Sequence, residues 1–130
     1  MIDPVKARCR SIYQHHRARA RKFHKELDYQ CSALTTLVIQ ALERLFCPYC
    51  HGVLKAERFQ VDHDRPVSRC CDFSLANLRV CCEKCNQYKG SLSGDEFGQL
   101  MELIRTWHPA AGNDVLCRLR AGGKVKGGWR

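Results

Sequence analysis

Two stretches of the chain have the hydrophobic pattern of core helices. From Ser32 to Phe46, apolar residues recur every three or four positions, the spacing of one helix face. The second stretch opens with the capping box Ser93-Gly94-Asp95-Glu96, continues to Trp107 and stops at His108-Pro109. Each segment has an apolar face broad enough to pack against a core, so the pattern predicts two core helices.

The N-terminal segment predicts a helix of a different kind. Asp3-Pro4 suits an N-cap followed by the first helical position, and neither Pro nor Gly recurs before Pro48. Residues 4–28 are therefore expected to be helical. Their apolar stripe is thin, so we expect this helix to lie on the domain or on nucleic acid rather than to anchor the core.

Short β segments are expected between the core helices. The helical period disappears between Cys47 and Asn77, where a small hairpin with a long loop fits the pattern. The remaining elements predicted from the sequence are strands at 53–54, 59–61 and 78–81, a helix at 83–89 ended by Gly90, and a last helix at 113–119.

Length and charge indicate one domain with two basic flanks. The 130 residues carry a net charge of +9, of which residues 1–25 contribute +7 and residues 118–130 contribute +5, leaving about −3 in the centre. We divide the chain into a basic N-terminal helical arm (1–30), a central domain with flanking helices (31–119) and a flexible basic tail (120–130). The arms are expected to hold phosphates of a nucleic acid, unless their charge serves solubility alone.

Four of the ten cysteines form two matched pairs. Cys47-Pro48-Tyr49-Cys50 and Cys82-Glu83-Lys84-Cys85 have the spacing at which thiolates occupy neighbouring corners of a tetrahedral zinc ion. His51 and Cys81 adjoin these pairs and are alternative ligands. No apolar run is long enough for a membrane span and no signal-peptide core is apparent, so we expect a cytoplasmic protein with reduced thiols and no membrane partner.

The segment between the pairs carries residues suited to phosphodiester hydrolysis. Such a reaction needs a base for the attacking water, a divalent ion for the developing charge, and donors that hold the phosphate. In Val61-Asp62-His63-Asp64-Arg65-Pro66, His63 can accept a proton and Asp62 is a hard oxygen ligand; Asp64 is an alternative to Asp62. Neighbouring strand residues face opposite sides, so the backbone is expected to turn near Asp62 and His63.

The ordered motifs resemble the HNH endonuclease family, the ββα-metal nucleases, in its zinc-bearing form. The motifs are the two cysteine pairs, Asp62-His63, Asn77-Leu78 and Asn86-Gln87-Tyr88-Lys89-Gly90, and the resemblance covers roughly residues 45–107. It implies an α+β fold: a ββα-metal (HNH) core with a structural four-cysteine zinc site, flanked by α-helices.

The resemblance also implies roles for individual residues. His63 is the general base, Asp62 and Asn86 bind a catalytic Mg²⁺ or Mn²⁺ ion, and Asn77 orients the loop and the His63 ring. Asn86 stands where the family often has His, which makes this an HNN variant. Arg65 and Lys89 are candidate phosphate contacts.

One departure from the family pattern lies after the catalytic histidine. Where members frequently have Gly-Gly after the serine, this chain has Ser68-Arg69-Cys70-Cys71. The conformation of this loop is left open, and Cys70 and Cys71 are packing residues, redox-sensitive thiols or additional metal ligands.

The predicted function is a divalent-metal-dependent endonuclease acting on double-stranded DNA, leaving 5′-phosphate and 3′-hydroxyl ends as the resemblance implies. A different class stays open: a non-catalytic zinc-ribbon module that binds DNA or RNA. A third reading is a subunit of a larger phage or mobile-element assembly. Target sequence, oligomeric state and the choice between nicking and double-strand cleavage have no signature in the sequence.

Overall fold

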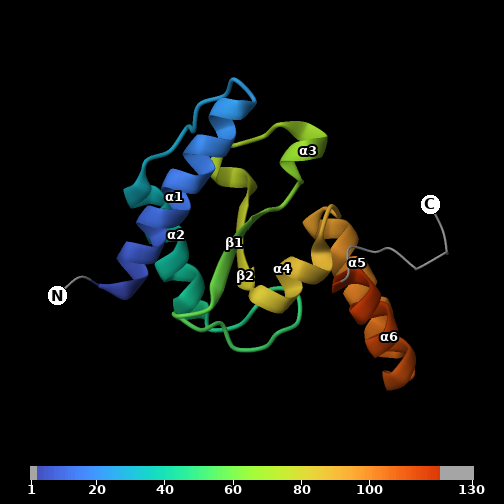
Figure 1. Ribbon diagram of the computed structural model, residues 1–130. Helices are drawn as coiled ribbons and strands as arrows, with labels where there is room; N and C mark the ends of the chain where they lie inside the picture. Colours follow the sequence, from blue (N-terminus) through green and yellow to red (C-terminus); the bar gives the residue numbers. More distant parts are fainter. Residues whose placement is uncertain (1–2, 121–130) are drawn as a thin grey trace.

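The computed structural model describes residues 3–120 (Figure 1). The segment 121–130, which makes up nearly all of the predicted basic tail, lies outside the described residues. In chain order the elements are α1 (Pro4–Lys22), α2 (Cys31–Arg44), β1 (Phe59–His63), α3 (Val67–Cys70), the 3-10 helix η1 (Leu75–Asn77), β2 (Leu78–Cys82), α4 (Glu83–Lys89), α5 (Gly94–Thr106) and α6 (Pro109–Arg120).

The sheet is a single antiparallel hairpin of β1 and β2. Asp62 lies opposite Arg79, and His63 lies opposite Leu78. Figure 1 shows the hairpin between the α1–α2 pair and α4. A small antiparallel sheet surrounded by helices confirms the α+β fold class.

Two predicted features of the β region were wrong in detail. Residues 53–54 form no named strand, since Val53 makes only an isolated bridge with Phe46. The hairpin instead pairs 59–63 with 78–82, and residues 47–52 form a turn closed by their own backbone hydrogen bonds. Within the long loop, α3 and η1 form two short helical turns that the sequence pattern did not indicate.

The predicted helix boundaries are partly confirmed. Asp3 caps α1 through a 2.9 Å bond from the Val5 amide to its carboxylate, Gly90 ends α4 with a φ of 51°, and Ser93 forms the expected capping box of α5. The prediction that α1 extends to residue 28 was wrong: it ends at Lys22, and His24 adopts a left-handed φ of 57°.

Two other helices begin earlier than expected. The core helix α2 starts at Cys31, one residue before Ser32. The last helix starts at Pro109 instead of Asn113, because Pro fits the first helical position and His108 Nδ1 accepts a 3.2 Å bond from the Ala110 amide. The pair His108-Pro109 thus both follows α5 and begins α6.

The core lies between α2, the hairpin and α5. Its fully buried side chains include Leu34, Val38, Phe59, Leu78 and Phe97. Helix α1 packs against α2 and buries Cys9 and Ala20 completely, so it lies on the domain and also contributes to the core. Among the described helices, none is long and apolar enough to cross a membrane.

Arg8 ties α1 to the hairpin. Its guanidinium donates a 2.6 Å hydrogen bond from Nη2 to the Phe59 carbonyl and lies 4.9 Å from the centre of the Phe59 ring. The interaction combines a charge-assisted hydrogen bond with a cation–π contact, and it joins two elements 51 positions apart.

We predict that Arg8→Ala lowers the free energy of unfolding by about 2 kcal/mol, because a partly buried charge-assisted hydrogen bond is lost. Arg10→Ala, at an exposed position of the same helix, is the matched control and should change it by less than about 0.5 kcal/mol. Urea titration of both variants measures the difference. Equal stability of the two variants would contradict the role given to Arg8.

Candidate active site and metal centre

The side chains of Cys47, Cys50, Cys82 and Cys85 come together in one cluster. Their Sγ atoms all lie within 4.8 Å of one another, and the Cys50 and Cys82 sulfurs are 3.8 Å apart. Four sulfurs bound tetrahedrally at about 2.3 Å from an ion are separated by about 3.8 Å. The cluster therefore has the dimensions and the donor atoms of a four-thiolate metal site.

Local backbone structure prepares each pair of thiols. In the first pair, the Cys47 amide donates to the Gly52 carbonyl at 2.7 Å, and the Gly52 amide lies 3.4 Å from Cys50 Sγ. In the second pair, Cys82 ends β2 and caps α4, with the Cys85 amide 3.4 Å from Cys82 Sγ. Amides directed at sulfur favour the thiolate that a metal requires.

The electrostatics of the four thiols favour a bound cation. Hydrogen bonds from Cys82 and Cys85 hold the pKa of Cys47 far below its ordinary value, while the proximity of Cys47 and Cys82 raises the pKa of Cys85. Without an ion, the sulfurs of Cys47, Cys82 and Cys85 compete for negative charge. A divalent cation at their centre would let all four ionise.

The alternative ligands His51 and Cys81 do not belong to the cluster that the described residues form. Cys81 is fully buried elsewhere in the core, and this burial raises the pKa of its thiol. Cys70 and Cys71 are also outside the cluster. The Cys70 thiol instead lies 3.4 Å from the Pro66 carbonyl, a contact within the turn of α3.

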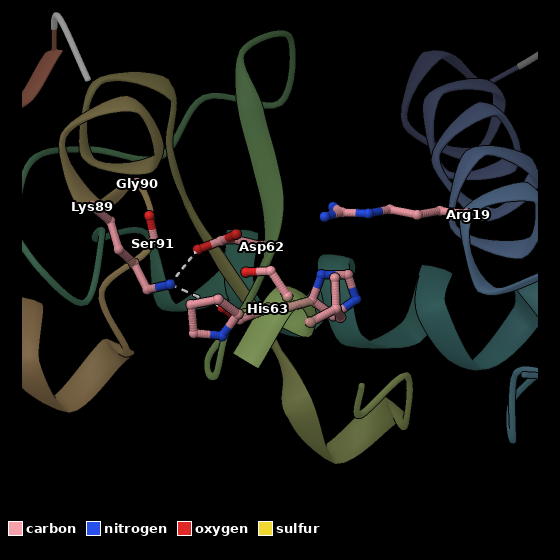
Figure 2. Close-up of a pocket in the computed structure, with 9 residues that line it drawn as sticks. Arg19, Asp62, His63, Lys89, Gly90 and Ser91 are labelled. Carbon is pink, nitrogen blue, oxygen red and sulfur yellow. Dashed lines mark hydrogen bonds and ion pairs between the residues drawn. The ribbon is translucent and has the colours of Figure 1, made fainter. Parts of the chain in front are cut away.

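A separate cavity of about 180 Å³ contains the two central residues of the predicted catalytic motif. Figure 2 shows Asp62 and His63 at its wall, with Arg19 reaching in from α1 and Lys89 from α4. Val67 and Ser68 of α3 and Gly90 after α4 complete much of the lining. The hairpin, α1, α3 and α4 thus all contribute to one cavity.

Asp62 and His63 share this cavity without the expected turn between them. The β1–β2 register stays regular through His63, and the chain leaves the strand only afterwards. The cavity lies at the end of β1, where side chains on both faces of the last two residues can border it.

Lys89 holds the end of β1 in place. Its side chain is completely buried, and its ammonium lies 2.8 Å from Asp62 Oδ2 and donates a 2.9 Å hydrogen bond to the His63 carbonyl. The contact with Asp62 is an ion pair without hydrogen-bond alignment, since Oδ2 finds no hydrogen-bond partner in the described residues. Lys89 therefore lies enclosed at the cavity wall, and its charge is compensated by Asp62.

His63 has the surroundings of a neutral base. Burial, together with the positive charges of Arg19 and Lys89, lowers the pKa of His63 to about 4. Its ring lies 5.0 Å from the His16 ring and 5.9 Å from the Phe73 ring, measured between centroids. Its Nε2 atom is buried and has no hydrogen-bond partner among residues 3–120. At neutral pH the imidazole is thus uncharged and able to accept a proton.

Asn77 fixes the loop that follows His63. Its Oδ1 accepts from the Arg65 amide, and its Nδ2 donates to the carbonyls of Arg65 and Asp72, each at 2.9 Å. Its backbone carbonyl accepts from the Asp64 amide at 2.7 Å. The buried asparagine therefore orders the loop. Its side-chain hydrogen bonds go to Arg65 and Asp72, while the rings that pack beside His63 are those of His16 and Phe73.

The other predicted site residues lie away from the cavity. Of the described residues that line it, none is Asn86, Asp64 or Arg65. Asn86 is half-buried on α4, one turn before Lys89. The Asp64 carboxylate lies 3.9 Å from Arg79 Nε, and Arg65 pairs with Asp72 at 2.7 Å. Asp62 is thus the carboxylate that shares the cavity with His63.

Two residues of α1 reach the site although no motif indicated them. Arg19 lines the cavity, and the buried His16 ring packs beside His63, with His16 Nδ1 3.2 Å from the Tyr29 hydroxyl. In the sequence they are two positions in a basic helix rich in arginine and histidine. Only the packing of α1 across the end of the hairpin distinguishes them from their neighbours.

The comparison with known families agrees with this geometry. Residues 47–101 match the family model described as HNH endonuclease. This match confirms the resemblance that the motifs indicated, and the matched segment contains both cysteine pairs, the hairpin and α4. A comparison with curated proteins finds no match. The chain therefore contains a segment that matches a nuclease family and that carries four cysteines positioned to bind a metal ion.

We predict that Asn77→Ala lowers the free energy of unfolding by about 2 to 3 kcal/mol, because one part-buried amide and two carbonyls lose their partner. Asn86→Ala is the matched control. The described residues offer its side chain no hydrogen bond, so its effect should stay within about 0.5 kcal/mol. Hydrogen exchange at the Arg65 amide should accelerate only in Asn77→Ala; unchanged exchange there would contradict the assignment.

Proposed function

We propose that this protein is a divalent-metal-dependent endonuclease that hydrolyses phosphodiester bonds of double-stranded DNA. One observation supports this function most directly: a neutral histidine and a carboxylate line the same cavity within the segment that matches the nuclease family. His63 is the general base and its buried, unpartnered Nε2 is the atom that accepts the proton.

The size of the cavity favours a polymer over a small molecule. Pockets for drug-sized ligands usually have roughly 300 to 1,000 Å³, whereas this cavity has about 180 Å³. A cavity of this size suits one phosphate group with its attacking water. The remainder of the substrate must then lie across the surface, as a nucleic-acid strand does.

The protein's own residues prepare the chemical step in three ways. Lys89 fixes Asp62 and the His63 backbone, Asn77 orders the loop after the strand, and burial keeps the His63 ring neutral. Positioning of this kind raises the catalytic rate, because the base is already held in place before the reaction begins. Lys89 and Asn77 are positioning residues in this scheme.

The donor set at Asp62 fits a hard divalent ion. Mg²⁺ keeps several waters and commonly uses one or two carboxylates, and the Asp62 side chain is 21% exposed at an open cavity. Asp62 would hold the ion. Asn86 lies on α4 and does not line the cavity, so its side-chain amide would have to turn towards Asp62 to serve as a second ligand. When bound, Mg²⁺ or Mn²⁺ supplies positive charge for the phosphate and the leaving oxygen.

The four-cysteine site is proposed to hold structural zinc. A complete set of four thiolates leaves no open position for a substrate or water, which is typical of structural sites. The ion would join the turn at residues 47–50 to the start of α4, with 31 residues of chain between Cys50 and Cys82. It would thereby secure the helix that carries Lys89.

We predict about one zinc ion per chain, lost when Cys82 and Cys85 are both replaced by serine. The double variant should also lose its cooperative unfolding transition, because metal binding contributes directly to folding. Elemental analysis and circular dichroism measure the two effects. Cys70→Ser with Cys71→Ser is the matched control and should retain zinc; zinc retained by the Cys82/Cys85 variant would refute the site.

We predict that His63→Ala abolishes plasmid cleavage in Mg²⁺ or Mn²⁺, because the proton acceptor of the chemical step is removed. Zinc content and DNA affinity should stay near wild type. The control His15→Ala removes an exposed histidine of α1 and should cleave normally.

The outcomes distinguish an endonuclease from a non-catalytic module that binds nucleic acid. Cleavage by His63→Ala at the wild-type rate would exclude His63 as the base. A wild-type protein that binds DNA tightly but cleaves it with neither ion would instead be the non-catalytic zinc-ribbon module.

A further inference from the structure

The positively charged side chains near the catalytic cavity differ in whether a carboxylate of the protein already compensates their charge. Lys89 is buried and compensated by Asp62. Three nearby arginines are paired with carboxylates: Arg65 with Asp72, Arg69 with Glu96 and Arg79 with Asp64. Arg19 is exposed, lines the cavity, and makes no ion pair or side-chain hydrogen bond within residues 3–120.

The position of Arg19 is set by the packing on either side of it. The following residue, Ala20, is fully buried in a cluster with Val67 of α3 and Phe73 of the loop. One turn earlier, His16 is buried between Tyr29 and the His63 ring. These contacts hold this part of α1 across the end of the hairpin, and Figure 2 shows the Arg19 side chain extending from the helix towards Asp62 and His63.

An unpaired guanidinium at this place suits a phosphate. Arginine donates two parallel hydrogen bonds to two oxygens of a phosphate group, and it stays charged at any pH the protein tolerates. Asp62 is already compensated by Lys89, whereas the positive charge that Arg19 brings to the cavity has no partner among residues 3–120. A phosphodiester that enters brings the matching negative charge.

We propose that Arg19 binds the scissile phosphate, so that α1, outside the segment that matches the nuclease family, completes the active site. This assignment rests on the proposed function. It also gives α1 a role beyond general attraction of nucleic acid: one arginine of this basic helix acts on the reacting group. Charge that develops on the phosphate oxygens in the transition state is stabilised by this side chain.

The test compares Arg19→Ala with Arg17→Ala in the full-length protein. Two residues along an α-helix are about 200° apart, so Arg17 is on the opposite side of α1 and lines a different hollow with Tyr13 and Arg21. Both variants lose one positive charge from the same helix. Cleavage of a defined DNA duplex is measured under single-turnover conditions at saturating protein with Mn²⁺, and affinity is measured separately without divalent ion.

Arg19→Ala is expected to lower the saturated cleavage rate by about 100-fold or more, the usual effect of losing one transition-state donor. Its DNA affinity should fall no more than that of Arg17→Ala. The saturated cleavage rate of Arg17→Ala should fall less than about threefold, because a single surface phosphate contact acts mainly on binding. Arg19→Lys should recover part of the rate, since charge is kept but the two-pronged geometry is lost. Urea titration should show wild-type stability for Arg19→Ala.

Each other result has a distinct meaning. Equal rate losses in Arg19→Ala and Arg17→Ala would overturn the proposal and indicate a general electrostatic effect of α1. Wild-type cleavage by Arg19→Ala would overturn it while leaving the endonuclease intact. Absence of cleavage by the wild-type protein would contradict the proposed function itself, and with it the role of Arg19.

Discussion

The closeness of four cysteine sulfurs is the constraint on which the arrangement of the domain depends. Sγ atoms within 4.8 Å of one another join the turn at Cys47–Cys50 to the junction of β2 and α4. Because Cys82 and Cys85 lie at the start of α4, the cluster sets where that helix begins. Lys89, at the other end of the same short helix, then reaches Asp62 and the His63 carbonyl.

The cysteine cluster and the cavity are therefore connected through one helix of two turns. A helix of seven residues has little stability by itself, and α4 depends on its contacts at both ends. Two cysteines of the cluster, Cys82 and Cys85, lie at its start. At its last turn, the buried ammonium of Lys89 forms an ion pair with Asp62. The same helix carries Asn86 between these points, which links the proposed structural ion to the proposed catalytic one.

Motifs with fixed spacing allowed much of the site to be predicted from the sequence. The four cysteines, Asp62 and His63 follow from local patterns, and the structure places the first four in one cluster and the last two in one cavity. Arg19 and His16 could not be predicted, because their position depends on how α1 packs across a hairpin about 45 residues away. The length of α1 was also overestimated, since no Gly or Pro marks the left-handed turn at His24.

Restoration of zinc to the metal-free protein tests most directly whether the cysteine cluster supports the cavity at Asp62 and His63. Zinc is removed under reducing conditions, and DNA cleavage is then measured at constant Mn²⁺ while zinc is added back in substoichiometric steps. Cleavage should be absent without zinc and rise linearly until one zinc per chain is bound, because α4 and Lys89 are then held in place. Full cleavage by the zinc-free protein would contradict the account.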